Sequence, residues 1–425
     1  MVSFYRYVVL WLSQGVSQLG SSMTAFALVL WMYEQSSSAL AVSVMSFCQF
    51  VPYLLVSVFA GVFVDRHRKK VVMLVSDGVA ALASLSVLVF FLAGTLSPWH
   101  IYLMNVIVGI TTAFQQPAAS VAVAKIVPED KLSNVSGMNS FSSNLVVVFS
   151  PMLAAVFFSA GGLPLILFCD LLSFLTAFCV LLFLIAIPEE LGREEFVSPF
   201  AGIGVGFRFL KREKGLLYLM VTMAMLNFFS RLTYENILSP MILARSSSDS
   251  VVLGSVNGCM GIGGILGGVL VSVKGESRKK ADLIYRSAAL SFLLGDLVMA
   301  VGRNVFFWSF AAFAASLPLP FLMAAQNLIL YKKVPEAIQG RVFAARNVLQ
   351  FCTIPFGILL GGYLADHVFE PLMSSGIGVA DFLGKIVGTG AGSGMAVMFL
   401  CTGICGFFMS IAALSNKEIQ KLNDC

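Results

Sequence analysis

The sequence predicts an all-α membrane protein with twelve transmembrane helices. Hydrophobic residues make up 58% of its 425 residues, and charged residues make up only 12%. A soluble domain carries about 25% charged residues, so the surface of this chain cannot lie mostly in water. Stretches of about 18 or more apolar residues recur from end to end, and that length is enough for a helix to cross a bilayer.

The apolar stretches fall into two sets of six. The first six predicted spans are 5–33, 39–64, 71–93, 99–126, 134–160 and 163–187. The second six are 216–244, 251–273, 281–301, 305–331, 339–366 and 395–414. The first span is too long for the core of a signal peptide and no small-residue cleavage site follows it, so we expect it to be retained.

The positively charged residues gather on one side of these spans. Of the 27 lysines and arginines, all but four lie near the N-terminus, around the loops that follow even-numbered spans, or in the C-terminal tail. The exceptions are Arg231, inside a span, and Arg245, Arg303 and Lys385, on the opposite side. Because cytoplasmic loops carry the excess of lysine and arginine, we expect both termini in the cytoplasm. This placement explains the net charge of +5 without nucleic acid as a partner.

The longest segment on the predicted cytoplasmic side, 188–215, divides the chain. It separates an N-terminal half at 1–187 from a C-terminal half at 216–415, which a short tail at 416–425 follows. After a polar start, apolar residues recur at helical spacing beside basic ones. The apolar positions are Phe200, Ile203, Phe207 and Leu210. This pattern predicts a helix in the inner membrane interface, with its basic side chains toward lipid headgroups.

A second long segment, 366–394, lies on the side opposite the basic loops. It is rich in glycine and contains one weakly apolar piece, 379–387, which is too short to span a bilayer. We expect a surface or re-entrant element here, and the sequence assigns it no role.

The loop between the second and third spans carries the most informative motif, Gly61-Val-Phe-Val-Asp65-Arg66-His67-Arg68-Lys69-Lys70. The positive-inside rule accounts for its basic residues but not for Gly61 or Asp65. A glycine four residues before an acid, followed by a basic cluster, resembles the loop between helices 2 and 3 of major facilitator superfamily transporters. The resemblance implies two six-helix bundles around a central cavity near the membrane midplane.

Further stretches resemble one group of that superfamily, the macrolide-efflux and drug:proton antiporters of the transmembrane secretion effector type. They include Gln116-Pro117-Ala118, Cys169-Asp170-Leu-Leu-Ser173-Phe174, Gln339-Gly340-Arg341-Val342-Phe343 and Gly388-Thr-Gly-Ala-Gly-Ser-Gly394. The similarity runs nearly end to end and implies secondary transport. Two departures concern coupling. The region after Asn105 lacks the arginine that many antiporters carry in helix 4, and the stretch around Pro151 lacks their glycines, so proton coupling is not carried over from that arginine.

The resemblance also implies an inner gate. In the resembling transporters, the acid of the helix 2–3 loop docks on the cytoplasmic start of helix 11. Here Gly61 would allow close approach, and Asp65 would meet the backbone amides at the start of the eleventh span, where the helix dipole favours an anion. Arg66 and Arg68 would hold neighbouring acids. The predicted gating residues are Gly61, Asp65, Arg66, Arg68, Gln339, Gly340 and Arg341.

Charges inside a membrane are costly, so each charge within a span is a candidate for substrate binding or proton coupling. The candidates are Asp77, Asp170, Arg231, Glu235 and Asp296. Asp77 lies two turns from the basic loop, and pairing with a basic residue of that loop is the favoured interpretation. Asp170 matches an acid of the resembling exporters, and a binding role and a structural role both stay open. For Asp296, which has no obvious partner, a structural role is favoured.

Arg231 and Glu235 stand four residues apart in the most polar stretch of any span. Residues at this spacing share a helix face and can pair. A pair that faces the cavity would bind a polar or charged group on the cargo, or would carry a proton through Glu235. The alternative is a buried pair that only fixes helix packing.

These features predict a secondary active transporter of the bacterial inner membrane that exports a hydrophobic drug or natural product by proton antiport. The expected partners are a small hydrophobic substrate, membrane lipid and the coupling proton, and the protein is expected to be a monomer. The sequence contains no nucleotide-binding P-loop, so ATP is not expected to drive transport directly. We expect no cofactor and no metal, because Cys401 and Cys405 share a helix face without an accompanying histidine or carboxylate.

Other functions stay open. The nearest are export of a dedicated metabolite such as a siderophore and movement of lipid between leaflets. A non-transporting membrane sensor would need an appended signalling domain, and we expect only a short tail after the last span. An enzyme is not expected, because His67, His100 and His367 lie at span edges and no catalytic motif converges on them. The sequence does not fix the cargo, the coupling ion or the direction of transport.

Overall fold

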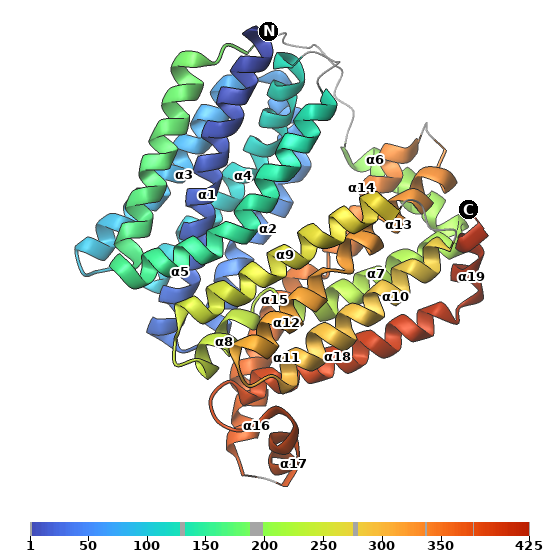
Figure 1. The fold of residues 1–425 in the computed structure, drawn as a ribbon. Coiled ribbons are helices and arrows are strands. Elements are labelled where there is room, and N and C mark those ends of the chain that lie inside the picture. Colours follow the sequence, from blue (N-terminus) through green and yellow to red (C-terminus); the bar gives the residue numbers. More distant parts are fainter. Residues whose placement is uncertain are drawn as a thin grey trace. The chain divides into compact units, whose positions relative to one another are not determined.

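The chain folds into two compact helical units. This computed structural model describes residues 2–127, 132–187, 199–274, 279–335, 338–376 and 378–424. One unit comprises Met1–Ser36 and Val44–Phe196, and the other comprises Ser37–Ser43 and Val197–Cys425. Within the described residues every regular element is a helix, and each unit is a bundle of long helices (Figure 1).

The N-terminal unit is built from long helices and a short π-helix. Their bounds are α1 Val2–Ser36, α2 Ala39–Arg66, α3 Lys69–Leu92, α4 Pro98–Ile126, α5 Leu132–Cys179 and the π-helix η2 Val180–Leu184. The first residues of α2, 39–43, belong to the other unit. Helix α5 contains two membrane spans, because Gly162 in its middle has φ +65° and ψ −163°. That conformation is open almost only to glycine. The predicted boundary between the fifth and sixth spans falls at this residue.

The C-terminal unit has more and shorter helices, because several of its spans are interrupted. It opens with α6 Pro199–Arg212, α7 Lys214–Thr233, α8 Leu238–Arg245, α9 Ser250–Lys274, α10 Lys280–Leu290, the π-helix η3 Ser291–Asp296 and α11 Leu297–Val301. It continues with α12 Val305–Ser316, α13 Leu319–Lys333, α14 Gln339–Phe351, α15 Ile354–Leu364, the π-helix η5 Ala365–Phe369 and α16 Glu370–Ser374. It ends with α17 Gly378–Val387, α18 Ser393–Leu414, α19 Lys417–Gln420 and the 3-10 helix η6 Lys421–Asp424.

The predicted fold is confirmed. In the described residues, 11 stretches are long and apolar enough to cross a membrane. One of them, Phe141–Leu184, contains the two spans that meet at Gly162, which accounts for the twelfth span. Six spans therefore precede the segment 188–215 and six follow it.

Close backbone contacts hold the N-terminal unit together. Helix α1 packs along α5, and α3 packs along α4. At Gly109 of α4, a Cβ atom would collide with the backbone carbonyl of Gln49 on α2. Small residues allow transmembrane helices to approach in this way, which matters because lipid leaves no hydrophobic driving force between them.

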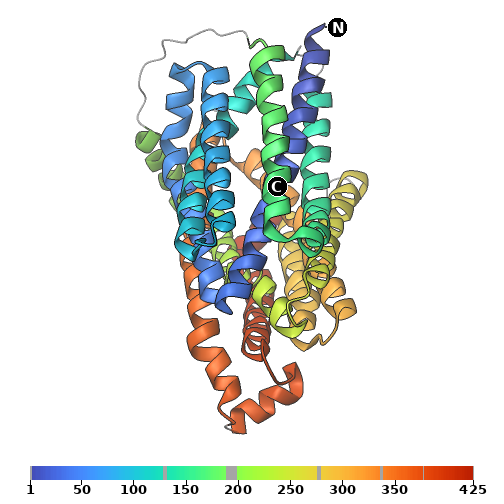
Figure 2. The ribbon, with the colours of Figure 1, turned by 90° about the vertical axis from the view of Figure 1, so that its left-hand side faces the viewer.

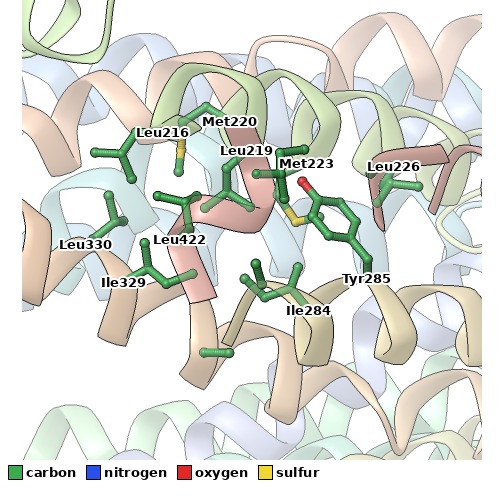
Figure 3. Packing of buried hydrophobic residues seen from close by; sticks show 14 of the residues in the cluster. Leu216, Leu219, Met220, Met223, Leu226, Ile284, Tyr285, Ile329, Leu330 and Leu422 are labelled. Atoms are coloured by element: carbon green, nitrogen blue, oxygen red, sulfur yellow. The ribbon is translucent and has the colours of Figure 1, made fainter. Parts of the chain in front are cut away.

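The C-terminal unit contains an apolar cluster where α7, α10, α13 and the C-terminal tail meet (Figure 3). Its buried side chains include Leu216, Leu219 and Met220 of α7, Ile284 and Tyr285 of α10, Ile329 and Leu330 of α13, and Leu422 of the tail. A polar contact also fixes the tail, because Asn423 Oδ1 accepts from the amides of Ala281 and Asp282 at 2.8 and 3.1 Å. Asn423 thereby caps the N-terminus of α10.

The amphipathic helix predicted after the polar segment is present as α6. It packs against α14, where a Cβ at Gly206 would collide with the carbonyl of Arg341. Its Leu210 is fully buried in the apolar cluster of the C-terminal unit, while the basic residues on its other face stay exposed. The side chains of Phe200 and Ile203 lie outside the described part of the chain.

The segment 366–394, to which the sequence assigns no role, begins inside a long helix. Helices α15, η5 and α16 run continuously over 354–374, and the whole stretch Arg341–Ser374 is 34 residues long. About 20 residues suffice to cross a bilayer, so this helix extends beyond it. Helix α17 then lies against α16 (Figure 2).

Candidate functional site

Asp170 is enclosed by hydroxyl groups within the N-terminal unit. It lies in the second half of α5, and only 4% of the residue is exposed. Ser21 and Thr24 of α1 donate to its two carboxylate oxygens at 3.0 and 2.9 Å. Gly20 lets α1 come close, since a Cβ there would lie 3.1 Å from the Cα of Asp170. Among the described residues, no lysine, arginine or histidine is paired with this carboxylate.

Asp296 is enclosed in a similar way within the C-terminal unit. It is the last residue of η3 and is 1% exposed. Thr402 Oγ1 of α18 donates to its Oδ1 at 2.9 Å, and the hydroxyl of Thr233 at the end of α7 also reaches the carboxylate. Gly403 lets α18 come close, since a Cβ there would lie 3.0 Å from the Cβ of Asp296. A π-helical turn of this kind is frequent at functional sites.

The seventh span is broken. The sequence predicts one continuous helix, whereas α7 ends at Thr233 and α8 begins at Leu238. Pro240 explains the break, because it has no N–H to donate to the carbonyl of Asn236 and its ring crowds that carbonyl. Asn236 holds the broken chain in place by donating from Nδ2 to the carbonyl of Ile358 on α15 at 3.1 Å.

Tyr234 lies in this break and brings an unpaired hydroxyl beside η3. Its Oη is buried and has no hydrogen-bond partner among the described residues. A Cβ at Gly295, the residue before Asp296, would lie 2.9 Å from that oxygen. The ring packs edge to face against Phe399 of α18, with the centroids 5.2 Å apart. The break therefore places a polar aromatic side chain next to the enclosed carboxylate.

Arg231 and Glu235 form the ion pair that their spacing predicts, with Arg231 Nη1 donating to Glu235 Oε2. Arg231 belongs to the last turns of α7, and Glu235 lies in the break. Their side chains are 36% and 43% exposed, so the pair is not sealed inside its bundle.

A cavity of about 440 Å³ lies within the N-terminal unit, between α1, α3, α4 and α5. Its polar and aromatic lining includes Tyr7, Trp11, Gln14, Gln18, Asn139 and Ser142. Trp11 Nε1 donates to the carbonyl of Met138 at 3.1 Å, and Tyr7 Oη donates to Asn139 Oδ1 at 3.0 Å. Both rings are thus held in place. Sequence reasoning missed this cavity because it weighed charged residues, and these side chains are neutral.

Asp77 stands beside that cavity. Gln14 Nε2, from the cavity lining, donates to Asp77 Oδ2 at 3.5 Å. The sequence suggested a partner from the nearby basic loop. Lys70 of that loop instead donates to the carbonyls of Leu182 and Ile185, at the end of the sixth span, at 2.9 and 2.7 Å.

The predicted gating residues lie at the ends of two helices. Gly61 is in α2 with open space where a Cβ would stand, and Arg66 and Arg68 are exposed. The side chain of Asp65 lies outside the described part of the chain. Its docking therefore stays a prediction.

The other predicted gating residues, Gln339, Gly340 and Arg341, form the first turn of α14. Gln339 Nε2 donates to the carbonyls of Tyr331 and Val334 at 3.3 and 3.1 Å, which satisfies the end of α13. Gln339 therefore stabilises the end of α13, whether or not it also takes part in gating.

Asp366 has a structural role that the sequence did not reveal. Its carboxylate accepts from the amides of Ala39 and Leu40 at 3.0 Å each, at the N-terminus of α2. A negative charge at this position is also stabilised by the positive end of the helix dipole. The partners are more than 300 residues apart in sequence, which is why no local pattern predicts the contact.

The fold and the enclosed charges define a class of protein. Twelve spans, a discontinuous helix and a carboxylate enclosed in each helical unit are features of a secondary membrane transporter. A family model described as transmembrane secretion effector matches residues 3–389. The chain belongs to this family of MFS-type transporters, as the resemblance in its sequence predicted, and it is a multi-pass membrane protein rather than an enzyme.

Similar proteins span nearly the whole chain. Macrolide efflux protein A of Streptococcus pyogenes is 26% identical over 371 residues, which cover 85% of this chain and 90% of that protein. The multidrug efflux pump Tap of Mycolicibacterium fortuitum is 23% identical over 377 residues, which cover 82% and 86%. The solved structure of a bacterial homologue of the iron transporter ferroportin, in an inward-facing state, matches with a TM-score of 0.71 at 14% identity and covers 97% of this chain and 99% of that one. This last likeness shows the fold alone.

Proposed function

We propose that this protein exports a hydrophobic drug or natural product by proton antiport, through alternating access. Membership of its family and its similarity to proteins named for macrolide and multidrug efflux support this proposal. We place it in the bacterial inner membrane as a monomer with both termini in the cytoplasm, because its positive charges gather on that side.

The observation that carries the coupling mechanism is a carboxylate enclosed by hydroxyls in each unit. Asp170 and Asp296 are 4% and 1% exposed, and neither is paired with a cation among the described residues. A lone buried carboxylate is costly as an anion, and a proton removes that cost. Each carboxylate therefore holds a proton while it is enclosed and releases it when the helices around it admit water. Serine and threonine hydroxyls suit both states, since they can donate to the anion or accept from the acid.

Asp296 is the principal proton site in this proposal. It ends a π-helix and adjoins the broken seventh span, and both irregular elements offer places where helices can rearrange. The buried hydroxyl of Tyr234 supplies an unused hydrogen-bonding group beside η3. Asp170 lies in a continuous helix and serves as the second site.

We place cargo binding at the cavity of the N-terminal unit. Its volume of about 440 Å³ falls within the usual range for small-molecule sites, about 300–1,000 Å³. Fixed aromatic rings beside amide and hydroxyl groups suit a large, weakly polar molecule. The pair Arg231 and Glu235 of the C-terminal unit is partly exposed, and in this proposal it binds a charged group on the cargo.

The inner gate belongs to the same proposal. Asp65 docks on the first turn of α14, at Gln339–Arg341, when the cytoplasmic side closes. Helix N-termini present unpaired amides, which stabilise an anion.

Efflux from energised cells tests the proposal. Cells that produce the protein are loaded with a fluorescent lipophilic cation, and their macrolide susceptibility is measured with and without a protonophore. We expect faster efflux and higher resistance, both abolished by the protonophore. Absence of both effects, with the protein present in the membrane, would contradict drug export. Accumulation of a siderophore in the medium, or a changed lipid distribution between leaflets, would then indicate one of the alternatives.

A further inference from the structure

A basic pocket lies within the C-terminal unit beside the glycine-rich loop that follows α17. Its volume is about 410 Å³. The lining comes from the end of α8, the turn between α11 and α12, and this loop. The residues that matter are Arg245, Arg303, Trp308 and the loop residues Gly388, Thr389 and Ala391, which we call the arginine pocket.

The distribution of positive charges along the sequence already distinguishes this pocket from the other loops. Arg245, Arg303 and Lys385 are the basic residues that lie on the side opposite all other loop cations. The structure gathers them: Arg303 Nη2 lies 3.5 Å from the carbonyl of Lys385, and Arg245 Nη2 donates to the carbonyl of Val387 at 2.7 Å. Two cations that depart from the positive-inside rule, Arg245 and Arg303, thus share one site, and the third contributes its backbone carbonyl.

The two guanidinium groups converge on one point. A Cβ at Gly388 would lie 3.6 Å from Arg303 Nε and 3.8 Å from Arg245 Nη2. Like charges this close repel each other, so an anion between them is favoured. Arg245 is held firmly, because its Nη1 donates to the carbonyl of Gly302 at 3.0 Å, and Trp308 Nε1 donates to the same carbonyl at 3.0 Å.

The loop backbone adds donors. Gly388, Gly390 and Gly392 have φ of +90°, +95° and +79°, and they alternate with Thr389 and Ala391, which lie outside the left-handed region. Alternation of this kind turns successive amides toward one side and forms an anion-binding nest. Within the described chain, the amides of Thr389, Gly390 and Ala391 have no hydrogen-bond acceptor.

A purely structural role explains only part of this arrangement. The bonds of Arg245 to carbonyls cap the ends of α11 and α17, but Arg303 is exposed and makes only the 3.5 Å contact. The acid that acts on Arg245 is Glu370, whose Oε1 is already engaged by the amide of Met395 at 3.0 Å. Two guanidinium groups are therefore matched by one carboxylate, and the site keeps an excess of positive charge.

We propose that the arginine pocket binds a phosphate group, either from the headgroup of an anionic phospholipid or from free phosphate. Guanidinium groups bind phosphate oxygens through paired, charge-assisted hydrogen bonds, and backbone amides complete the coordination. The location of the pocket on the non-cytoplasmic face rests on the orientation proposed above, whereas phosphate binding itself does not. The proposed transport mechanism assigns no role to the segment 366–394. Phosphate binding at the arginine pocket gives it one.

Binding to the purified full-length protein tests the proposal. Native mass spectrometry compares retention of phosphatidylglycerol with retention of phosphatidylcholine. Thermal unfolding compares sodium phosphate with sodium chloride at matched ionic strength. The variants are Arg303→Gln, Arg303→Lys and the control Arg286→Gln, which changes an exposed arginine on α10 of the same unit. Arg303 is exposed, so its replacement should leave the fold intact.

Selective binding in either assay supports the site, and the two assays distinguish the sources. Selective retention of phosphatidylglycerol alone indicates a lipid headgroup, and stabilisation by phosphate alone indicates a free anion. We expect Arg303→Gln to weaken binding about tenfold, Arg303→Lys to retain part of it, and Arg286→Gln to bind like the wild type. The proposal is overturned if the wild type prefers neither phosphatidylglycerol nor phosphate, or if Arg303→Gln binds as tightly as the control.

Discussion

Asp170 and Asp296 are set in nearly the same chemistry in separate helical units. Within the described residues, each carboxylate accepts hydrogen bonds from serine or threonine hydroxyls and is paired with no cation. In both cases a glycine on the packed helix, Gly20 or Gly403, makes room for the acid. A larger residue at either position would push the hydroxyl donors away. The two sites thus depend on helix packing as much as on the acids themselves.

Glu235→Gln should weaken the handling of cationic cargo. The change leaves Arg231 with an uncompensated positive charge on a partly exposed surface, which repels cations. We expect the KM for a cationic cargo to rise about three- to tenfold, with little change for a neutral cargo. Equal effects on both kinds of cargo, or none, would point to a pair that only fixes helix packing.

Gly109→Ala should destabilise the protein although alanine is the better helix former. A Cβ there meets the backbone carbonyl of Gln49, which cannot move without shifting α2. Overpacking of this kind costs about 1–3 kcal/mol. The matched control is Gly78→Ala on α3, where a Cβ has open space and should stabilise the helix by up to about 1 kcal/mol. Thermal unfolding in detergent measures both, and equal stability of the two variants would refute the packing argument.

At the scale of whole elements, the two units differ in regularity. The spans of the N-terminal unit are continuous apart from the change of direction at Gly162 and the π-helix η2 that ends the sixth span, whereas the C-terminal unit contains the break after α7 and the π-helices η3 and η5. Irregular helices in membranes are tolerated where protein or water satisfies the freed backbone groups. Asn236 does so at the break by donating from Nδ2 to the carbonyl of Arg231, in the last turn of α7, at 3.3 Å.

Gly162→Ala should disturb the junction of the fifth and sixth spans. The backbone there has φ +65° and ψ −163°, and an alanine would be strained by about 1–3 kcal/mol. We expect a lower unfolding temperature than that of Gly78→Ala, measured under the same conditions. If the two variants unfold at the same temperature, the junction does not require a glycine.

At the scale of the whole molecule, hydropathy and length predicted the twelve spans, because a bilayer imposes both on every helix that crosses it. The boundary at Gly162 was also predictable, since two small residues interrupt an otherwise apolar run. The break in the seventh span was missed, although Pro240 is a visible local cause. The sequence thus predicts elements well where a local rule governs them.

The sites were less predictable, because distant residues build them. The acids Asp170 and Asp296 stand out as charges within apolar spans, but their hydroxyl donors come from other helices, as with Ser21 and Thr402, which are 149 and 106 residues away. The cavity of the N-terminal unit carries no charge in its polar lining, so a search for charges passes over it. Only the fold brings such neutral groups together.

The most direct test of the account is cargo uptake into proteoliposomes driven by an imposed pH gradient. The wild type, Asp296→Asn and Asp170→Asn are compared, each also in exchange of labelled for unlabelled cargo without a gradient. Asparagine keeps the shape of the acid but cannot release a proton. We predict that Asp296→Asn loses gradient-driven uptake while it retains exchange. Gradient-driven uptake by Asp296→Asn at the wild-type rate would contradict the assignment of Asp296 as the principal proton site.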